Sequence, residues 1–210
     1  MSLHIMIGLI GLIYIVVFGA MTVLRREGLS IRFAVESLVI TAICVILVVL
    51  TAVQIHPVVF LLLLYLITMR VRILVDVANL FAGRRNYAQA EKIYDLAGRM
   101  WPDQTGDLVI EVNHAIFLLQ KNQLDESVAL FTDVLSQANK GFLGVKYEAA
   151  VHYNLGVAYL RKNNPSMATI EFNAVLDTWP ASVYARRAQQ ALERQHHKRA
   201  AQPEEKPPTE

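Results

Sequence analysis

The chain has 210 residues, of which 54% are hydrophobic, with a formal net charge of +2 and a single cysteine. A nearly neutral charge gives no basic footprint for nucleic acid, and one cysteine excludes a disulfide framework or a cysteine-based metal site. Charges recur every few residues after Met69, but before it they are limited to Arg25, Arg26, Glu27, Arg32 and Glu36. The sequence therefore predicts a membrane region in residues 1–70 and an ordinary helical region after it.

The N-terminal region contains two apolar runs of the length needed to cross a bilayer, at about 5–24 and 33–53. The first has no Lys or Arg before it and two arginines directly after it, the reverse of a cleavable signal peptide. A third span over about 58–75 contains Arg70 and Arg72, which leaves two spans as the alternative. Three spans place every basic cluster inside, as the positive-inside rule expects. We therefore favour an integral membrane protein with its N-terminus outside and its C-terminal half cytoplasmic.

Turn residues at about 84–86, 121–123 and 162–164, taken together with the family resemblance described next, predict seven further helices. Six of them form three hairpins, at about 71–83 and 87–100, 106–120 and 124–138, and 146–161 and 165–177. The seventh, at 182–199, has a polar outer face and suits the capping of an open helical stack. The tail at 200–210 is rich in Pro and Glu and is predicted to be disordered.

A motif in the last hairpin identifies a family resemblance. Between residues 154 and 180 the spaced residues are Leu155, Gly156, Tyr159, Ala168, Phe172 and Pro180. This order resembles the tetratricopeptide repeat (TPR), a two-helix unit of about 34 residues. In such a unit the small Gly156 lets the two helices approach closely, and Pro180 cannot continue the second helix.

Two weaker copies of the motif precede this one. The first contains Ala90, Tyr94 and Pro102, and the second contains Ser127 and Phe131. The alanine-equivalent positions are separated by 37 residues (90 to 127) and 41 residues (127 to 168). The resemblance implies repeats at about 71–104, 108–141 and 149–182, and hence an all-α fold of transmembrane helices followed by a short TPR-type α-solenoid of three helix pairs. Generic helical hairpins are the alternative.

No pattern in the chain indicates catalysis. Its six histidines lack the spacing of a metal site, and no phosphate-binding loop, nucleophile elbow or dinucleotide fingerprint occurs. We therefore expect a protein that is not an enzyme, with no catalytic residues, no metal and no cofactor.

The TPR resemblance implies instead a concave groove, lined by the first helix of each pair, that holds a peptide or a partner helix. The positions carried over to this groove are Val75, Asn79, Val112, Asn113, Ile116, Leu119, Tyr153, Asn154, Val157 and Arg161. One TPR subfamily grips a terminal carboxylate with lysine, arginine and asparagine. Here the asparagine places read Asn79 and Asn113, but the basic places read Val75, Ala150 and Asn154. Carboxylate capture is therefore disfavoured, and an apolar peptide or helix is expected.

These features together predict a membrane-anchored TPR protein that acts as a protein-interaction scaffold or assembly factor at the cytoplasmic face. Its partners would be the lipid bilayer and a protein in the groove, with no nucleic acid. The alternative is an accessory subunit of a membrane transport or secretion complex, in which the TPR part docks or regulates.

Overall fold

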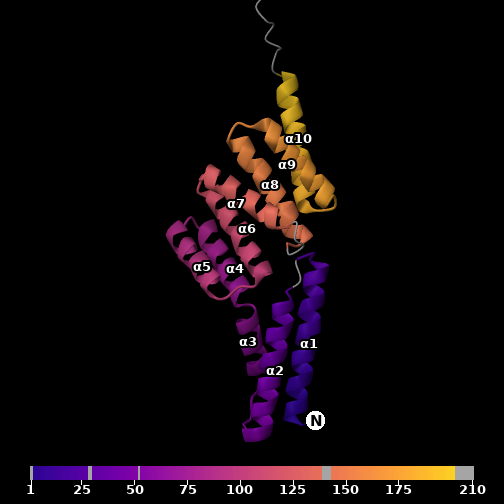
Figure 1. The fold of residues 1–210 in the computed structure, drawn as a ribbon. Coiled ribbons are helices and arrows are strands. Elements are labelled where there is room, and N and C mark those ends of the chain that lie inside the picture. Colours follow the sequence, from indigo (N-terminus) through magenta and orange to yellow (C-terminus); the bar gives the residue numbers. More distant parts are fainter. Residues whose placement is uncertain (1, 28–29, 52, 139–142, 202–210) are drawn as a thin grey trace, which may run out of the picture.

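The computed structural model describes residues 2–27, 30–51, 53–138 and 143–201, and all regular elements in these ranges are α-helices. The expected all-α class is therefore confirmed. Figure 1 shows a bundle of N-terminal helices that continues into a stack of helix pairs. The helices are α1 (Leu3–Leu24), α2 (Ile31–Thr51), α3 (Pro57–Thr68), α4 (Arg70–Gly83), α5 (Tyr87–Arg99), α6 (Gln104–Gln120), α7 (Leu124–Ala138), α8 (Val145–Arg161), α9 (Pro165–Thr178) and α10 (Val183–Ala201).

Helices α1 and α2 are long and apolar enough to cross a membrane. Most of their large aliphatic side chains are exposed, as lipid-facing residues are. The two helices lie side by side (Figure 1) and approach closely at Gly11, where an added Cβ would lie 2.3 Å from the Thr41 hydroxyl oxygen. Tyr14 and Thr68 share a hydrogen bond of 2.7 Å that ties α1 to α3.

The third apolar segment, expected as a span over 58–75, is divided between two helices. Pro57 begins α3, which ends at Thr68, and α4 starts at Arg70 after a bend of 71°. At the bend the guanidinium of Arg70 donates from Nη1 to Oε2 of Glu36 on α2 at 2.7 Å, so the start of α4 is held against α2. The chain therefore returns to the end of the bundle where α2 begins (Figure 1), with α3 as the short returning helix.

The remaining helices pack as α4 with α5, α6 with α7 and α8 with α9, and α10 covers the last pair. The turn inside each pair has one common geometry, with a left-handed residue at Arg85, Asn122 and Asn163 (φ of 61°, 62° and 55°). In each turn the next residue donates its N–H to the carbonyl five residues earlier, which closes a Schellman motif. The accepting carbonyls belong to Phe81, Leu118 and Tyr159, which hold the same place relative to the left-handed residue in the three turns.

The interior of each pair explains why the motif has small residues. A Cβ on Gly156 would lie 2.6 Å from Cε1 of Phe172, so only glycine allows this approach of α8 and α9. In the middle pair Ser127 donates to the carbonyl oxygen of Ala115 at 2.9 Å, which satisfies its buried hydroxyl across the pair. Most residues of the motif are buried. Tyr159 and Pro102 are half-buried, and Pro180 is exposed. The buried residues are Ala90, Tyr94, Ser127, Phe131, Leu155, Gly156, Ala168 and Phe172.

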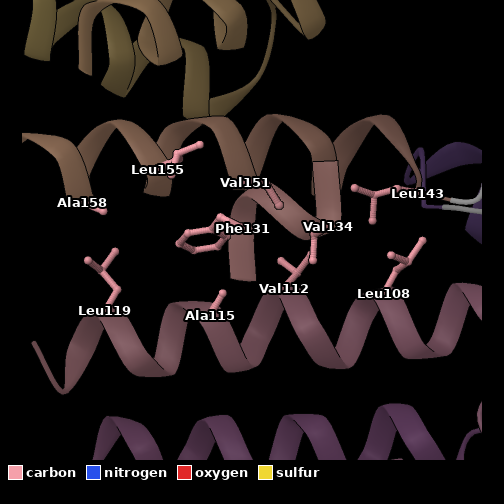
Figure 2. Close-up of a cluster of buried hydrophobic side chains, with 10 residues drawn as sticks. All are labelled: Leu108, Val112, Ala115, Leu119, Phe131, Val134, Leu143, Val151, Leu155 and Ala158. Carbon is pink, nitrogen blue, oxygen red and sulfur yellow. The ribbon is translucent and has the colours of Figure 1, made fainter. Parts of the chain in front are cut away.

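One hydrophobic cluster links the second and third pairs. Figure 2 shows its buried side chains from α6, α7 and α8, including Val112, Phe131 and Leu155. Two similar clusters join α4–α5 to α6 and α8–α9 to α10. Helix α6 therefore contributes side chains to two of these clusters, and residues of α6 that were predicted to line the groove are among them.

The predicted helix boundaries agree with the structure to within two residues for the three pairs. The capping helix was expected at 182–199 and extends over Val183–Ala201. Of the predicted disordered tail, residues 202–210 lie outside the described residues.

Candidate protein-binding groove

The first helices of the three pairs, α4, α6 and α8, carry all ten residues predicted to line the groove. Three of the ten, Val75, Val112 and Leu119, are only 2%, 1% and 4% exposed, which leaves little of their side chains for a partner to contact. Their side chains belong to the clusters that join successive pairs.

The two predicted asparagines meet each other across α4 and α6. Asn79 donates from Nδ2 to Oδ1 of Asn113 at 2.9 Å, and Asn113 donates to the carbonyl oxygen of Val109 at 2.7 Å. Tyr94 from α5 donates its hydroxyl to Oδ1 of Asn79 at 2.5 Å, and burial raises the pKa of Tyr94, which keeps this donor protonated. The side-chain amides of Asn79 and Asn113 therefore form hydrogen bonds within the protein and connect the first two pairs. These same bonds compete with any hydrogen bond to a bound peptide.

The predicted residues on α8 are also engaged in internal contacts. Asn154 donates to the carbonyl oxygen of Ala150 at 2.8 Å. Arg161 donates to the carbonyl oxygen of Leu119 at 2.9 Å and so bridges α8 to α6. Ile116 and Val157 are half-buried against the central cluster.

Tyr153 of α8 lies toward the capping helix. Its ring centroid is 5.9 Å from that of Phe172 and 5.9 Å from that of Tyr184 on α10. Helix α10 therefore packs against both helices of the third pair.

A cavity of about 290 Å³ lies where the α1–α2 connection meets α4, α6, α8 and α10. It shares Val75 and Asn113 with the predicted set, whereas its other lining residues were not predicted. The charged and aromatic side chains around it are Arg25, Glu27, Arg72, Asp76, Lys146, Tyr147 and Tyr184. Its lining is polar and of mixed charge, in contrast to the apolar groove that the sequence suggested.

Glu27, in the connection between α1 and α2, forms the floor of this cavity. Its side chain is only 3% exposed and lies between two cations, with 2.5 Å to Arg72 Nη2 and 2.6 Å to Lys146 Nζ. Burial alone would raise the pKa of Glu27, but the hydrogen bond from Lys146 and the positive charges of Arg72 and Lys146 together hold this pKa below its ordinary value. The carboxylate thus stays ionised and joins α4 to α8.

Neighbouring residues fasten the same connection to the helical stack. The backbone N–H of Lys146 donates to the carbonyl oxygen of Arg26 at 3.1 Å. The guanidinium of Arg26 lies over the ring of Trp179, 5.3 Å from its centroid. At the other side of the connection, Ser30 donates to the carboxylate of Asp103 at 2.5 Å. The α1–α2 connection therefore contacts the first, second and third pairs.

A second cavity, of about 200 Å³, lies at the junction between the membrane helices and the stack. Its walls come from α1, α2, the bend between α3 and α4, and the start of α6, and they are mainly apolar. It shares two lining residues, Arg72 and Val109, with the cavity of about 290 Å³.

Sequence reasoning missed Glu27 and Lys146 because their pairing links residues 119 positions apart. The only local signal was that Glu27 is the single acid among three arginines in that connection and the turn that follows it. Within the described part of the chain, no group of three or more His, Cys, Asp or Glu side chains is placed to hold a metal ion. No protein-family model, no curated protein and no solved structure matches this chain.

Proposed function

We propose that this chain is a membrane-anchored scaffold or assembly factor, built as a TPR-type solenoid on transmembrane helices, that binds a protein segment in its groove. Support for the repeat comes from the three equivalent Schellman turns and from the close approach of Gly156 to Phe172. Neither feature is required of unrelated hairpins. A solenoid of this kind exposes a concave wall built from its first helices, which suits binding rather than catalysis.

We propose that the stack lies in the cytoplasm, with the N-terminus on the opposite side of the membrane. The arginines that flank the apolar helices support this orientation, since Arg25, Arg26, Arg32 and Arg70 all lie at the end of the bundle that meets the stack. Basic residues at one end of a bundle favour the cytoplasmic side. The return of the chain at α3 puts α4 at that same end.

The cavity of about 290 Å³ is the observation that carries the binding proposal. Its mixed charge favours an amphipathic peptide or helix over a purely apolar one, because a basic or acidic side chain of the partner finds an opposite charge there. Asp76 is exposed and faces the cavity, so it offers an acceptor to a cation of the partner. Arg25 offers a donor to an anion.

A photo-crosslinking experiment in native membranes tests the proposal. A photoreactive amino acid replaces Tyr184 at the cavity, and the matched control replaces Ala129, which is exposed on the outer helix α7. We expect a protein adduct from position 184 that Asp76→Lys weakens, and none from position 129. Equal labelling from both positions would contradict the groove. A third probe at Val16, on the lipid-facing side of α1, distinguishes the alternative: adducts there alone would indicate an accessory subunit held by its membrane helices.

A further inference from the structure

We propose that the indole of Trp101 sits in the headgroup layer of the bilayer and anchors the first helix pair to the membrane surface. This inference rests on the insertion of α1 and α2 in a membrane, and is independent of any partner in the groove. It concerns a surface of the stack that contacts lipid rather than protein.

The chain contains two tryptophans, and they occupy equivalent places. Each stands directly before a proline after the second helix of a pair, as Trp101-Pro102 after α5 and Trp179-Pro180 after α9. Trp179 is half-buried and covered by the guanidinium of Arg26. Trp101 has no such cover and is 76% exposed, the most exposed aromatic side chain among the described residues.

The backbone around Trp101 is fixed to the membrane helices. Arg70, at the α3–α4 bend, donates to the carbonyl oxygens of Met100 at 2.9 Å and Trp101 at 3.3 Å, and it pairs with Glu36 of α2. Arg32, on the first turn of α2, donates to the carbonyl oxygen of Pro102 at 3.3 Å. These bonds hold the α5–α6 connection at the end of the stack that faces the bundle (Figure 1).

Trp101 itself has a φ of 48°, in the left-handed region that bulky residues avoid. The chain thus adopts an unfavourable backbone geometry at a residue whose side chain gains little burial in return. Contact with lipid supplies the missing burial.

The neighbouring surface combines charged and apolar side chains. Arg32, Glu36 and Arg70 form a polar cluster, and the side chains of Leu66 and Ile67, in the last turn of α3 before the bend, are exposed. Such a combination suits the boundary between headgroups and hydrocarbon. Tryptophan is enriched at this boundary because its ring is apolar and its N–H finds a hydrogen-bond partner there. The bilayer is therefore the occupant that fits this side chain.

Fluorescence of single-tryptophan variants tests the inference. The full chain carrying Trp179→Phe is reconstituted in phosphatidylcholine–phosphatidylglycerol vesicles. A fraction of the lipid molecules carries acyl chains that are brominated near the carboxyl end. We expect Trp101 emission at short wavelength, a loss of intensity with brominated lipid, and weak quenching by aqueous acrylamide. The matched variant Trp101→Phe leaves Trp179 under Arg26, and its emission is expected to respond much less to brominated lipid.

Resistance of the protein to alkaline extraction from the same vesicles verifies membrane insertion separately. Emission from Trp101 at the wavelength of tryptophan in water, with strong quenching by acrylamide, would overturn the lipid contact. If the same protein resists extraction, the insertion of its membrane helices is unaffected by that result. Should Trp179→Phe fail to fold, the wild-type signal minus that of Trp101→Phe reports on the same side chain.

Discussion

Gly156→Ala is the sharpest test of how the third helix pair is packed. The added methyl would lie 2.6 Å from Cε1 and 2.8 Å from Cδ1 of Phe172, whose ring is fully buried. The ring would have to retreat by close to 1 Å before the contact reached the ordinary range of about 3.5–4.0 Å. It has little room, because α10 packs against the same cluster.

Two opposing effects set the magnitude of this change. Alanine in place of glycine in a helix interior stabilises by about 1 kcal/mol. Forcing an extra methyl into a packed core costs about 1–3 kcal/mol. The packing cost outweighs the helix propensity here because the neighbour is a rigid ring rather than the end of a flexible side chain. We expect a net loss of about 1–2 kcal/mol, which corresponds to a factor of roughly 5–30 in the opening equilibrium.

Hydrogen exchange of the full chain in detergent micelles, followed by mass spectrometry, measures this loss in peptides from α8 and α9. Gly98→Ala is the matched control, because a Cβ on Gly98 meets nothing within 4 Å and should slow exchange slightly in α5. Combining Gly156→Ala with Phe172→Leu should cost less than the two changes added, since the smaller side chain makes room. Slower exchange in Gly156→Ala, as in Gly98→Ala, would refute the close-packed reading of this pair.

Three further changes probe other contacts. Protonation of Glu27, whose pKa is lowered in the folded chain, should release the α1–α2 connection as the pH falls below the ordinary glutamate value. Glu27→Gln should weaken the connection by about 1.5–3 kcal/mol at neutral pH and abolish that acid dependence, both followed by hydrogen exchange at the start of α8. Burial lowers the pKa of His114, so the stability of the first two pairs should fall as the pH drops below about 6.5, and His114→Phe should remove this fall in thermal unfolding scans. Gly11→Ala should lower the unfolding temperature in detergent because its methyl meets Thr41, whereas Gly19→Ala, which meets nothing within 4 Å, should not. Equal effects of the two glycine changes would contradict the close contact of α1 and α2.

The sequence was sufficient to predict the helix pairs because their signals are local. A turn residue such as Asn163 adopts the left-handed conformation, and Asn164 then accepts a hydrogen bond from the N–H of Met167 to start the next helix. Gly156 and Ala168 indicated close helix contact by size alone, and the structure buries both. Each of these features depends on residues fewer than twenty positions apart.

The accessible surface of the groove could not be predicted in the same way. Whether Val112 faces a partner or a neighbouring helix depends on how tightly successive pairs stack, which local spacing does not encode. The pairing of Glu27 with Lys146 depends on how the bundle sits against the stack, so no segment of sequence contains it. The bend at Met69 likewise involves a distant partner, since Arg70 pairs with Glu36.

The two carboxylates of Glu27 and Glu36 have a mechanical consequence. Glu36 pairs with Arg70 and Glu27 pairs with Arg72, and both arginines lie on α4. The first helix of the stack is therefore fixed to the bundle at two points and does not hang on a flexible linker. A domain on a flexible linker explores a volume set by the length of that linker. A domain fixed by two ion pairs keeps one height and one orientation relative to the bundle. With α1 and α2 inserted in a bilayer, as proposed, their tilting as the bilayer thins or thickens would change the height and orientation of the helical stack. On the proposed function, the stack would then bind partner segments held at one height above the membrane in preference to others.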